Sequence, residues 1–424
     1  MIGRLKGRSA TELKDRLLQF AWATAERRGV MPSIRVAQGM SLRPRTPWPV
    51  IDRESVLARL DSDAVSKLLA SADRIADGSF DVLGLSGVSY GVPVNWQRDP
   101  LAGREAAMVH WSRVPYLDHA IVGDHKITWE VNRHQWLITL GQAWILTGRA
   151  EYASTADRLL RAWLDANPPK LGINWCSALE LAFRVQSWIH GLRLLDGAPE
   201  LSAGTRRAVV ESAALQVDHV VRNLSTWFSP NTHLTGEALA MLSAGCAWPD
   251  LPAAAAWREH GWRILVRELP KQVRADGVYF EQSAWYQAYT VDFYLLGMQW
   301  ASLAGLAIPP DMPDTVSRAA SALQAVTRPD GTIARLGDDD GGRTLPYVPL
   351  QFGDMTDTLW RAATHLDDAT LVPPTADGRS ALLWLEGANR FDAATELVAA
   401  RGARASRCLP DGGWVTLAES GTTT

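Results

Sequence analysis

The sequence predicts an all-α protein whose helical hairpins are arranged in a ring, the architecture called an (α/α) toroid. Three observations lead to this prediction. From about residue 130 apolar residues recur at helical spacing, the loops between these segments are short and rich in Gly, Pro and Asp, and strand-like alternation is nearly absent before the last lines. Consecutive helices with short connections pack as antiparallel hairpins. Since no strict internal repeat is visible, a ring of hairpins is favoured over a regular solenoid.

Residues 1–100 are less regular than the rest and are expected to form an N-terminal helical extension. They contain one clear helical pattern near 10–28, a link rich in Pro and Arg, and a second helical pattern near 53–76. The ring itself is assigned to residues 101–400.

The helices expected in the ring have recognisable ends. The first includes Trp129 and stops at Gly148, the second ends at Pro168 because Pro cannot continue a helix, and the third has Asn174 as its cap. The other helices are expected at 204–224, 232–246, 253–274, 281–305 and 314–327.

The last segment, residues 401–424, has a different character. A Gly-Gly turn precedes the string WVTLAESG, which is a good start for a strand. Because one strand is not stable alone, we expect these residues to begin a β-rich domain that is mostly absent from the chain.

Charge and cysteine content argue against several classes of protein. A net charge of −3 provides no basic field for nucleic acid. The three cysteines lie far apart without a C-x-x-C pair, so neither a disulfide framework nor a structural zinc site is expected. The opening segment lacks the apolar core of a signal peptide, and no apolar run is long enough to span a membrane. By default the expected location is the cytoplasm.

Tryptophan is unusually frequent, with 19 residues against 8 Tyr and 8 Phe. One interpretation is that these side chains fill a large helical core. The other is that some of them stack on sugar rings through their aromatic faces.

The string SPNTHLTGE at 229–237 is the first candidate site. Asn231 could simply cap the following helix. His233 and Glu237 are four residues apart, so they share a helix face and could orient one another. Two such residues are too few to hold a metal ion, and no metal is expected.

The second candidate lies at 276–297. A helix that starts near Glu281 would place Gln282, Tyr286, Tyr289 and Phe293 on one face, where Gln282 could bond a Tyr hydroxyl. This aromatic stripe is either packing or part of a site.

Two further groups are weaker signals. Glu180 and Arg184 form either a surface ion pair or a semi-buried pair whose Arg faces a cleft. The segment GDDDGG within 329–343 lacks the spacing of a calcium-binding EF-hand loop, so we expect a tight, solvated turn.

Taken in order, these stretches resemble the toroid part of the heparinase II/III family over roughly residues 110–345. The resemblance implies an incomplete toroid followed by an antiparallel β-sandwich, of which this chain would hold only the first strand. It implies cleavage of uronic-acid polysaccharides such as glycosaminoglycans by β-elimination, with periplasmic or secreted action as the alternative to the cytoplasm. No cofactor is expected in this chain; a structural metal and a further His would belong to the absent domain.

The resemblance also implies roles for individual residues. Asn231 and His233 would hold the uronate carboxylate, and Tyr286 would act as the acid and also as the base, with Tyr289 as the second choice. The residues expected to contact the substrate or brace the cleft are Trp175, Glu180, Arg184, Glu237, Glu281, Gln282 and Tyr289. Many relatives have Asn-Asn-His where this chain has Asn231-Thr232-His233, and His where it has Gln287.

The residue types suit the chemistry independently of the resemblance. Removing the C5 proton of a uronate requires donors that neutralise its carboxylate, a base for the proton and an acid for the leaving O4. Asn, His and Tyr can supply these functions without a metal or redox cofactor.

Two other functions remain open at this point. A toroid glycoside hydrolase needs two carboxylates across a cleft, and the candidates are Glu180, Glu237, Glu281 and Asp338. A glycan-binding protein without turnover is the second alternative. In every case the expected partner is an acidic polysaccharide or oligosaccharide.

Overall fold

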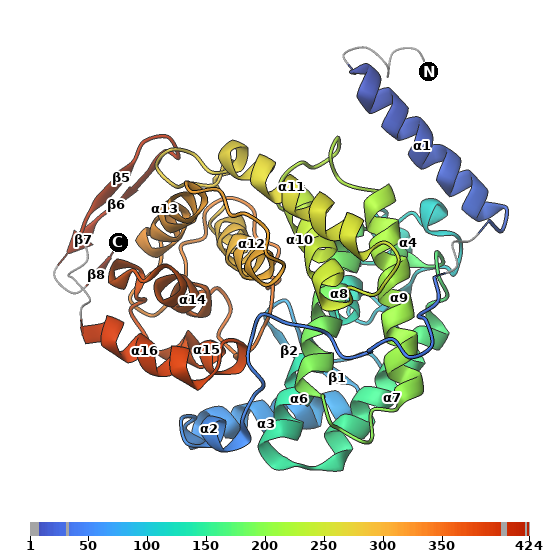
Figure 1. Ribbon diagram of the computed structural model, residues 1–424, viewed down its shortest axis with the longest axis horizontal. Helices are drawn as coiled ribbons and strands as arrows, with labels where there is room; N and C mark the ends of the chain where they lie inside the picture. Colours follow the sequence, from blue (N-terminus) through green and yellow to red (C-terminus); the bar gives the residue numbers. More distant parts are fainter. Residues whose placement is uncertain (1–7, 31–33, 400–404, 420–421, 424) are drawn as a thin grey trace.

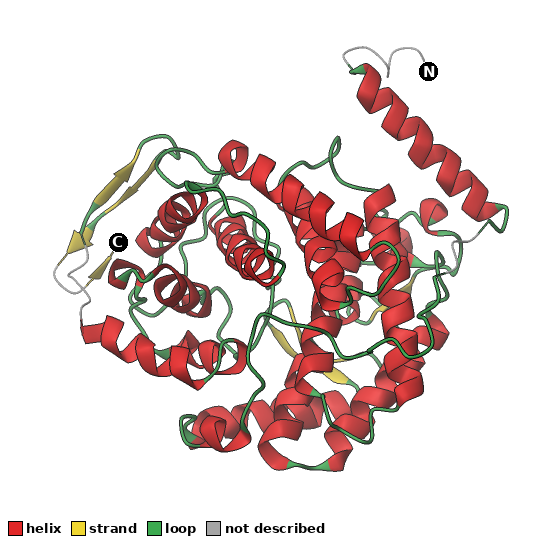
Figure 2. Ribbon diagram, in the orientation of Figure 1, coloured by secondary structure: helices red, strands yellow, loops and turns green. Residues whose placement is uncertain are grey.

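A computed structural model describes residues 8–30, 34–399, 405–419 and 422–423 (Figure 1). Most of the chain is helical, as Figure 2 shows. The α-helices are α1 Ala10–Arg27, α2 Arg53–Leu57, α3 Ser62–Ala76, α4 His119–Val122, α5 His125–Asn132, α6 Trp136–Thr147, α7 Ala150–Ala166, α8 Ala178–Leu194, α9 Ala203–Arg222, α10 Thr232–Ala247, α11 Ala254–Gln272, α12 Ala284–Leu303, α13 Met312–Ala325, α14 Thr356–Leu366, α15 Ser380–Leu385 and α16 Ala388–Ala399.

The remaining elements are short. The described 3₁₀ turns are η2 Trp111–Arg113, η3 Ile173–Trp175, η4 Ala369–Leu371 and η5 Asp377–Arg379. The strands are β1 Ser79–Val82, β2 Leu85–Ser89, β3 Arg98–Asp99, β4 Arg104–Glu105, β5 Arg407–Leu409, β6 Trp414–Thr416, β7 Ala418–Glu419 and β8 Thr422–Thr423. They pair in order as antiparallel hairpins.

The helices form an incomplete ring of two layers. The inner helices α6, α8, α10, α12 and α14 pack one against the next in this order, and α7, α9, α11 and α13 connect them from the outside. At the two ends of the series, α6 packs on α3 and α14 packs on α15 and α16. In α10 every residue except His233 is buried, as expected for a helix that is apolar all round. The predicted all-α toroid is confirmed.

Glycines bring α10 and α11 into close contact. A Cβ at Gly261 would lie 2.4 Å from the Ala238 carbonyl oxygen, and a Cβ at Gly245 would lie 2.4 Å from the Ala254 carbonyl oxygen. The two helix backbones therefore touch at positions that have no room for a side chain.

Two of the predicted helices are interrupted. The pattern near 53–76 is divided into α2 and α3, and Asp61 caps the second piece. The first ring helix is divided into α5 and α6 at His134, whose φ of 58° ends the helical path. The side chain of His134 is buried and accepts a hydrogen bond from Trp188 Nε1 at 2.8 Å. This tertiary contact has no signature in the local periodicity.

The N-terminal part contains more than helices. The β1–β2 hairpin lies between α3 and the ring and was not predicted. Helix α1 extends away from the ring (Figure 1), but its last turn is attached by Glu26. The carboxylate of Glu26 pairs with buried Lys170 at 2.9 Å and accepts from Trp111 Nε1 at 3.0 Å.

The C-terminal strand prediction is confirmed for the described residues. The segment 414–416 pairs with 407–409 as the β5–β6 hairpin. This hairpin contacts the ring where Gln282 Nε2 donates to the Gly412 carbonyl at 2.7 Å. Residues 401–404, 420–421 and 424, which the prediction also covered, lie outside the described residues.

Most tryptophans belong to the core. Fifteen of the 19 are among the buried residues, and the exceptions are Trp22, Trp111, Trp144 and Trp227. The core interpretation therefore accounts for the excess. Within the described ranges, no helix combines the length and the apolar character that crossing a bilayer requires.

Candidate active site

The N-terminal ends of α10 and α12 meet at the candidate site. Asn231 caps α10, because its side-chain oxygen accepts from the His233 backbone N–H at 3.0 Å. Its amide nitrogen donates to Glu281 Oε1 at 2.9 Å. The predicted cap is confirmed, and its side chain links α10 to the segment before α12.

Helix α12 begins three residues later than predicted. Gln282 has a φ of 57°, and the Ser283 hydroxyl caps the helix by accepting from the Tyr286 N–H at 3.0 Å. Glu281 and Gln282 therefore belong to the preceding turn. Tyr286 lies in the first turn of α12, directly above its cap.

The Tyr286 hydroxyl has a defined partner. It donates to Asp340 Oδ2 at 2.7 Å, and the other oxygen of Asp340 pairs with Lys126. Burial alone would raise the pKa of Asp340, but the hydrogen bonds from Lys126 and Tyr286 outweigh it, and the pKa is lowered. Asp340 is therefore an anion that anchors the phenol of Tyr286.

His233 and Tyr286 share the same charged neighbours. Burial lowers the pKa of His233, while the carboxylates of Glu180, Asp340 and Glu281 oppose this effect. The pKa of Tyr286 is raised, first by burial and then by Asp340, Asp338 and Glu281. Asp340 and Glu281 thus act electrostatically on both groups, and the Asn231–Glu281 hydrogen bond joins the starts of α10 and α12, so these groups form one polar cluster at the two helix ends. At neutral pH that cluster holds a neutral imidazole and a protonated phenol.

A buried ion pair centred on Arg133 lies next to the cluster. Arg133 binds Glu180 through two hydrogen bonds, at 2.7 and 2.8 Å, and pairs with Glu130 at 3.0 Å. The guanidinium lies 4.4 Å from the ring centroid of Phe183. Tyr289 stacks between the rings of Tyr286 and Phe293 on α12. Its buried hydroxyl has no hydrogen-bond partner in the described chain.

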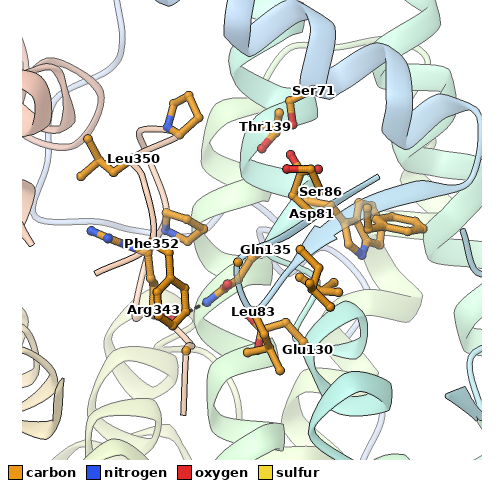
Figure 3. A pocket seen from close by; sticks show the side chains of 18 of the residues that line it. Ser71, Asp81, Leu83, Ser86, Glu130, Gln135, Thr139, Arg343, Leu350 and Phe352 are labelled. Atoms are coloured by element: carbon orange, nitrogen blue, oxygen red, sulfur yellow. Dashed lines mark hydrogen bonds between the residues drawn. The ribbon is translucent and has the colours of Figure 1, made fainter. Parts of the chain in front are cut away.

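A cavity of about 490 Å³ adjoins this cluster. Figure 3 shows Glu130, Gln135, Arg343 and Phe352 around it. It lies between the β1–β2 hairpin and the loop 341–353. Glu130 lines the cavity and also pairs with Arg133, so the cavity and this ion pair share a side chain, whereas Asn231, His233, Tyr286 and Asp340 do not line the cavity.

The sequence model of the family described as Heparinase II/III N-terminus matches residues 59–345 of this chain. The chain belongs to the heparinase II/III family. The matched segment includes Asn231, His233, Tyr286 and Asp340.

Individual relatives agree with this family. The chain is 26% identical over 233 residues to the heparin-sulfate lyase of Bacteroides stercoris, covering 50% of this chain and 34% of the relative. It is 27% identical over 259 residues to that of Pedobacter heparinus, covering 59% and 35%. The crystal structure of the heparan sulfate lyase from Pedobacter heparinus covers 95% of this chain and 54% of its own, with a TM-score of 0.53 and 20% identity. The chain spans about a third of the length of the curated relatives it matches.

Five of the seven residues expected to contact the substrate or brace the cleft are buried: Trp175, Glu180, Arg184, Glu237 and Tyr289. Trp175 and Arg184 have no exposed surface. Arg184 donates to the Asn132 carbonyl at 2.5 Å and to Gln216 Oε1 at 2.9 Å, and it does not pair with Glu180. Full burial contradicts direct substrate contact for Trp175 and Arg184 and is compatible with the bracing part of the expectation. Arg184 tethers backbone inside the ring, and Glu180 pairs with Arg133.

Glu237 is another of these buried residues. It is fully buried and accepts from the Ser225 N–H at 2.8 Å and from the Ser225 hydroxyl at 2.6 Å. Burial raises its pKa to about 8. Glu237 therefore fixes the loop before α10 and does not orient His233. Neither Glu180 nor Glu237 is available as a hydrolase carboxylate.

The departures from the family pattern lie away from the phenol of Tyr286. Gln287 is buried; its side chain accepts from the Tyr279 N–H at 2.6 Å and donates to the carbonyls of Gly277 and Ala319. Thr232 is buried beside Tyr279, whose hydroxyl accepts from the Thr232 N–H at 2.9 Å. Gln282 donates to the Gly412 carbonyl in the β5–β6 hairpin. The prediction that it bonds a Tyr hydroxyl is therefore wrong.

Sequence reasoning missed Asp340, Lys126 and Arg133 as members of the cluster. The prediction of a solvated turn holds for exposed Asp338 and Asp339 but is wrong for Asp340, which is half-buried between Lys126 and Tyr286. The available signal was Asp340 beside two glycines, one of which, Gly342, leaves no space for a Cβ against Arg133 and Tyr289.

Proposed function

We propose that this protein is a polysaccharide lyase that cleaves a uronic-acid polysaccharide by β-elimination. The observation that carries the proposal is the Tyr286 hydroxyl, bonded to Asp340 at 2.7 Å in the cluster that also holds His233. Membership of the heparinase II/III family and the names of the heparin-sulfate lyase relatives support the same reaction.

Tyr286 is assigned as the general acid. Its phenol keeps its proton at neutral pH, because burial and the Asp340 carboxylate both disfavour a phenolate. The phenol can therefore protonate O4 as the C4–O4 bond breaks. The same environment makes Tyr286 a poor base, so the double role expected from the resemblance is reduced to one.

His233 is assigned as the base. It is the one residue of α10 that is not buried, and its pKa is lowered, so it offers a neutral, partly exposed imidazole at the start of the helix. The imidazole takes the C5 proton, the electrons of the C5–H bond form the C4=C5 double bond, and O4 departs with the proton from Tyr286. No water is consumed.

Asn231 and Lys126 are assigned to the substrate carboxylate. One N–H of the Asn231 amide is used by Glu281, and the second N–H can donate to a carboxylate oxygen. The Lys126 side chain is 47% exposed, and its partner Asp340 also bonds Tyr286. Donors at the carboxylate lower the cost of the charge that develops when C5 is deprotonated.

The direct test is to incubate the chain with a panel of uronate polymers, including heparan sulfate, and to follow near-ultraviolet absorbance from the unsaturated uronate. Tyr286→Phe should lower the rate by about 100-fold or more, since a positioned acid contributes that much. Tyr294→Phe is the matched control, because its hydroxyl lies on the same helix but donates to the Leu265 carbonyl. Cleavage without absorbance would indicate a hydrolase, and binding without cleavage a glycan-binding protein; either result contradicts the proposal.

A further inference from the structure

We propose that His119, Asp124 and His125 form a binding site for a divalent transition metal, specifically zinc. The three residues each bring one ligand atom to within 4.8 Å of the others. They lie at the start of α4, at the cap of α5 and at the first residue of α5. This inference departs from the expectation, drawn from the sequence, that the chain binds no metal.

The ligand atoms of this cluster are free to bind an ion. Within the described chain, the imidazoles of His119 and His125 make no hydrogen bond, and Nδ1 of His125 is buried without a partner. A buried, unpaired polar atom costs about 1–3 kcal/mol, which coordination would remove. Asp124 uses Oδ1 to accept from the Lys126 N–H at 2.9 Å, and its other oxygen remains available.

Buried Asp99 holds the turn that carries the ligands in place. Asp99 is buried and accepts from the Asp124 N–H at 2.8 Å. Gly123 joins the ligands with a φ of 76°, and a Cβ there would lie 2.4 Å from the Asp99 carboxylate. Trp129 packs edge-on against the His125 ring, with the centroids 4.6 Å apart. Asp99 therefore fixes the backbone of the turn that carries the ligands, and Trp129 limits the orientation of the His125 ring.

The donor set selects the type of metal. Two imidazole nitrogens and one carboxylate oxygen suit zinc, whereas calcium and magnesium prefer oxygen ligands throughout. Three protein ligands leave one position of a tetrahedral zinc open to water or to an anionic oxygen. The bound ion would join α4 to the start of α5, next to Lys126 and its pair with Asp340.

The test is zinc binding to the full chain without a histidine tag, after treatment with a chelator and dialysis. Isothermal titration and elemental analysis should both give about one zinc per chain, as expected for a single three-ligand site. His119→Ala should abolish this binding without unfolding the protein, because His119 is exposed. Asp124→Asn should weaken it at least about 10-fold while still capping α5, since Asn caps helices as well as Asp.

His260→Ala, on α11, is the matched control and should retain full binding. Cobalt provides a second readout, because its visible absorption reports coordination by His and carboxylate and should disappear in His119→Ala. Zinc binding that is absent from the unaltered chain, or that survives His119→Ala unchanged, would overturn the proposal. Neither result depends on whether the protein has lyase activity.

Discussion

The phenol of Tyr286 is bonded to a carboxylate, and this pairing determines its protonation. Burial and the Asp340 charge both raise its pKa. In Asp340→Asn the amide oxygen can still accept the hydrogen bond, but the charge is lost. The phenol then becomes more acidic, and we expect the alkaline limb of the pH–rate profile to move to lower pH. A limb that stays in place or moves upward would show that Tyr286 does not supply the proton.

Glu237 allows a prediction about pH and stability. Its pKa is about 8 in the folded protein against 4.5 as the ordinary value. Between these values the folded state binds more protons than the unfolded state, so this residue makes stability fall as pH rises. The free energy of unfolding, measured with urea, should fall relative to Glu237→Gln by up to about 1.4 kcal/mol per pH unit between about pH 5 and about pH 8. A difference between the two proteins that is independent of pH would contradict this prediction.

At the scale of residues, the sequence identified the groups that cap helices or resemble a family motif. Asn231 at its cap and Tyr286 in the first turn of α12 were found in this way. Asp340 and Lys126 were not identified in this way. They lie 214 positions apart in the sequence, and local helical spacing cannot show that two such distant residues form an ion pair. Arg184 and Glu237 were misplaced because helical periodicity assigns a face, whereas burial in a ring depends on what covers that face.

At the scale of elements, the contact between α10 and α11 depends on glycine. Gly261→Ala would place a Cβ 2.4 Å from the Ala238 carbonyl oxygen and 2.8 Å from the Leu242 nitrogen. Since both are backbone atoms, the helices must move apart, and we expect a loss of about 1–3 kcal/mol in unfolding free energy. Gly204→Ala, where the nearest atom is the Ser202 hydroxyl oxygen at 3.8 Å, should be neutral or stabilising. Equal effects of the two substitutions in thermal unfolding would contradict the packing argument.

Long helices with apolar periodicity were predictable, and their interruptions were not. The pattern continues across His134 although the chain turns there, because the turn is stabilised by Trp188 from another helix. The β1–β2 hairpin was missed because its second strand, Leu85–Ser89, is mostly exposed and offers little apolar alternation.

At the scale of the whole molecule, the buried Glu26–Lys170 ion pair helps to attach α1 to the ring, together with the Trp227–Asp15 hydrogen bond and the Arg222 guanidinium over the Trp22 ring. Burial would raise the pKa of Glu26, but the hydrogen bonds from Lys170 and Trp111 lower it. Glu26→Gln leaves the Lys170 charge buried without a carboxylate, with the His219 imidazole at 2.7 Å as its remaining neighbour, and should reduce stability by on the order of 3 kcal/mol. Glu12→Gln removes a charge from the same helix whose partners are Arg8 and Arg16 at the surface, and it should cost less than about 1 kcal/mol.

Hydrogen exchange distinguishes these two variants. In Glu26→Gln, amides of α1 should exchange faster than in the unaltered chain, because the attachment is weakened. If α1 exchanges at the same rate in both variants, the helix is held by other contacts.

The ring as a whole was predictable because its signal is distributed over many helices and short loops, so errors at individual helix ends do not change the architecture. The resemblance to the heparinase II/III family added the expected site, and the family match over residues 59–345 confirms the family. The contacts between charged groups from distant segments could be found only from the structure.

The most direct measurement is the mass of the products formed from a defined uronate oligosaccharide. If the imidazole of His233 and the phenol of Tyr286 carry out an elimination, the masses of the two fragments sum to that of the substrate, and one fragment carries the C4=C5 double bond. Fragments whose summed mass exceeds the substrate by one water would show hydrolysis and contradict the central claim.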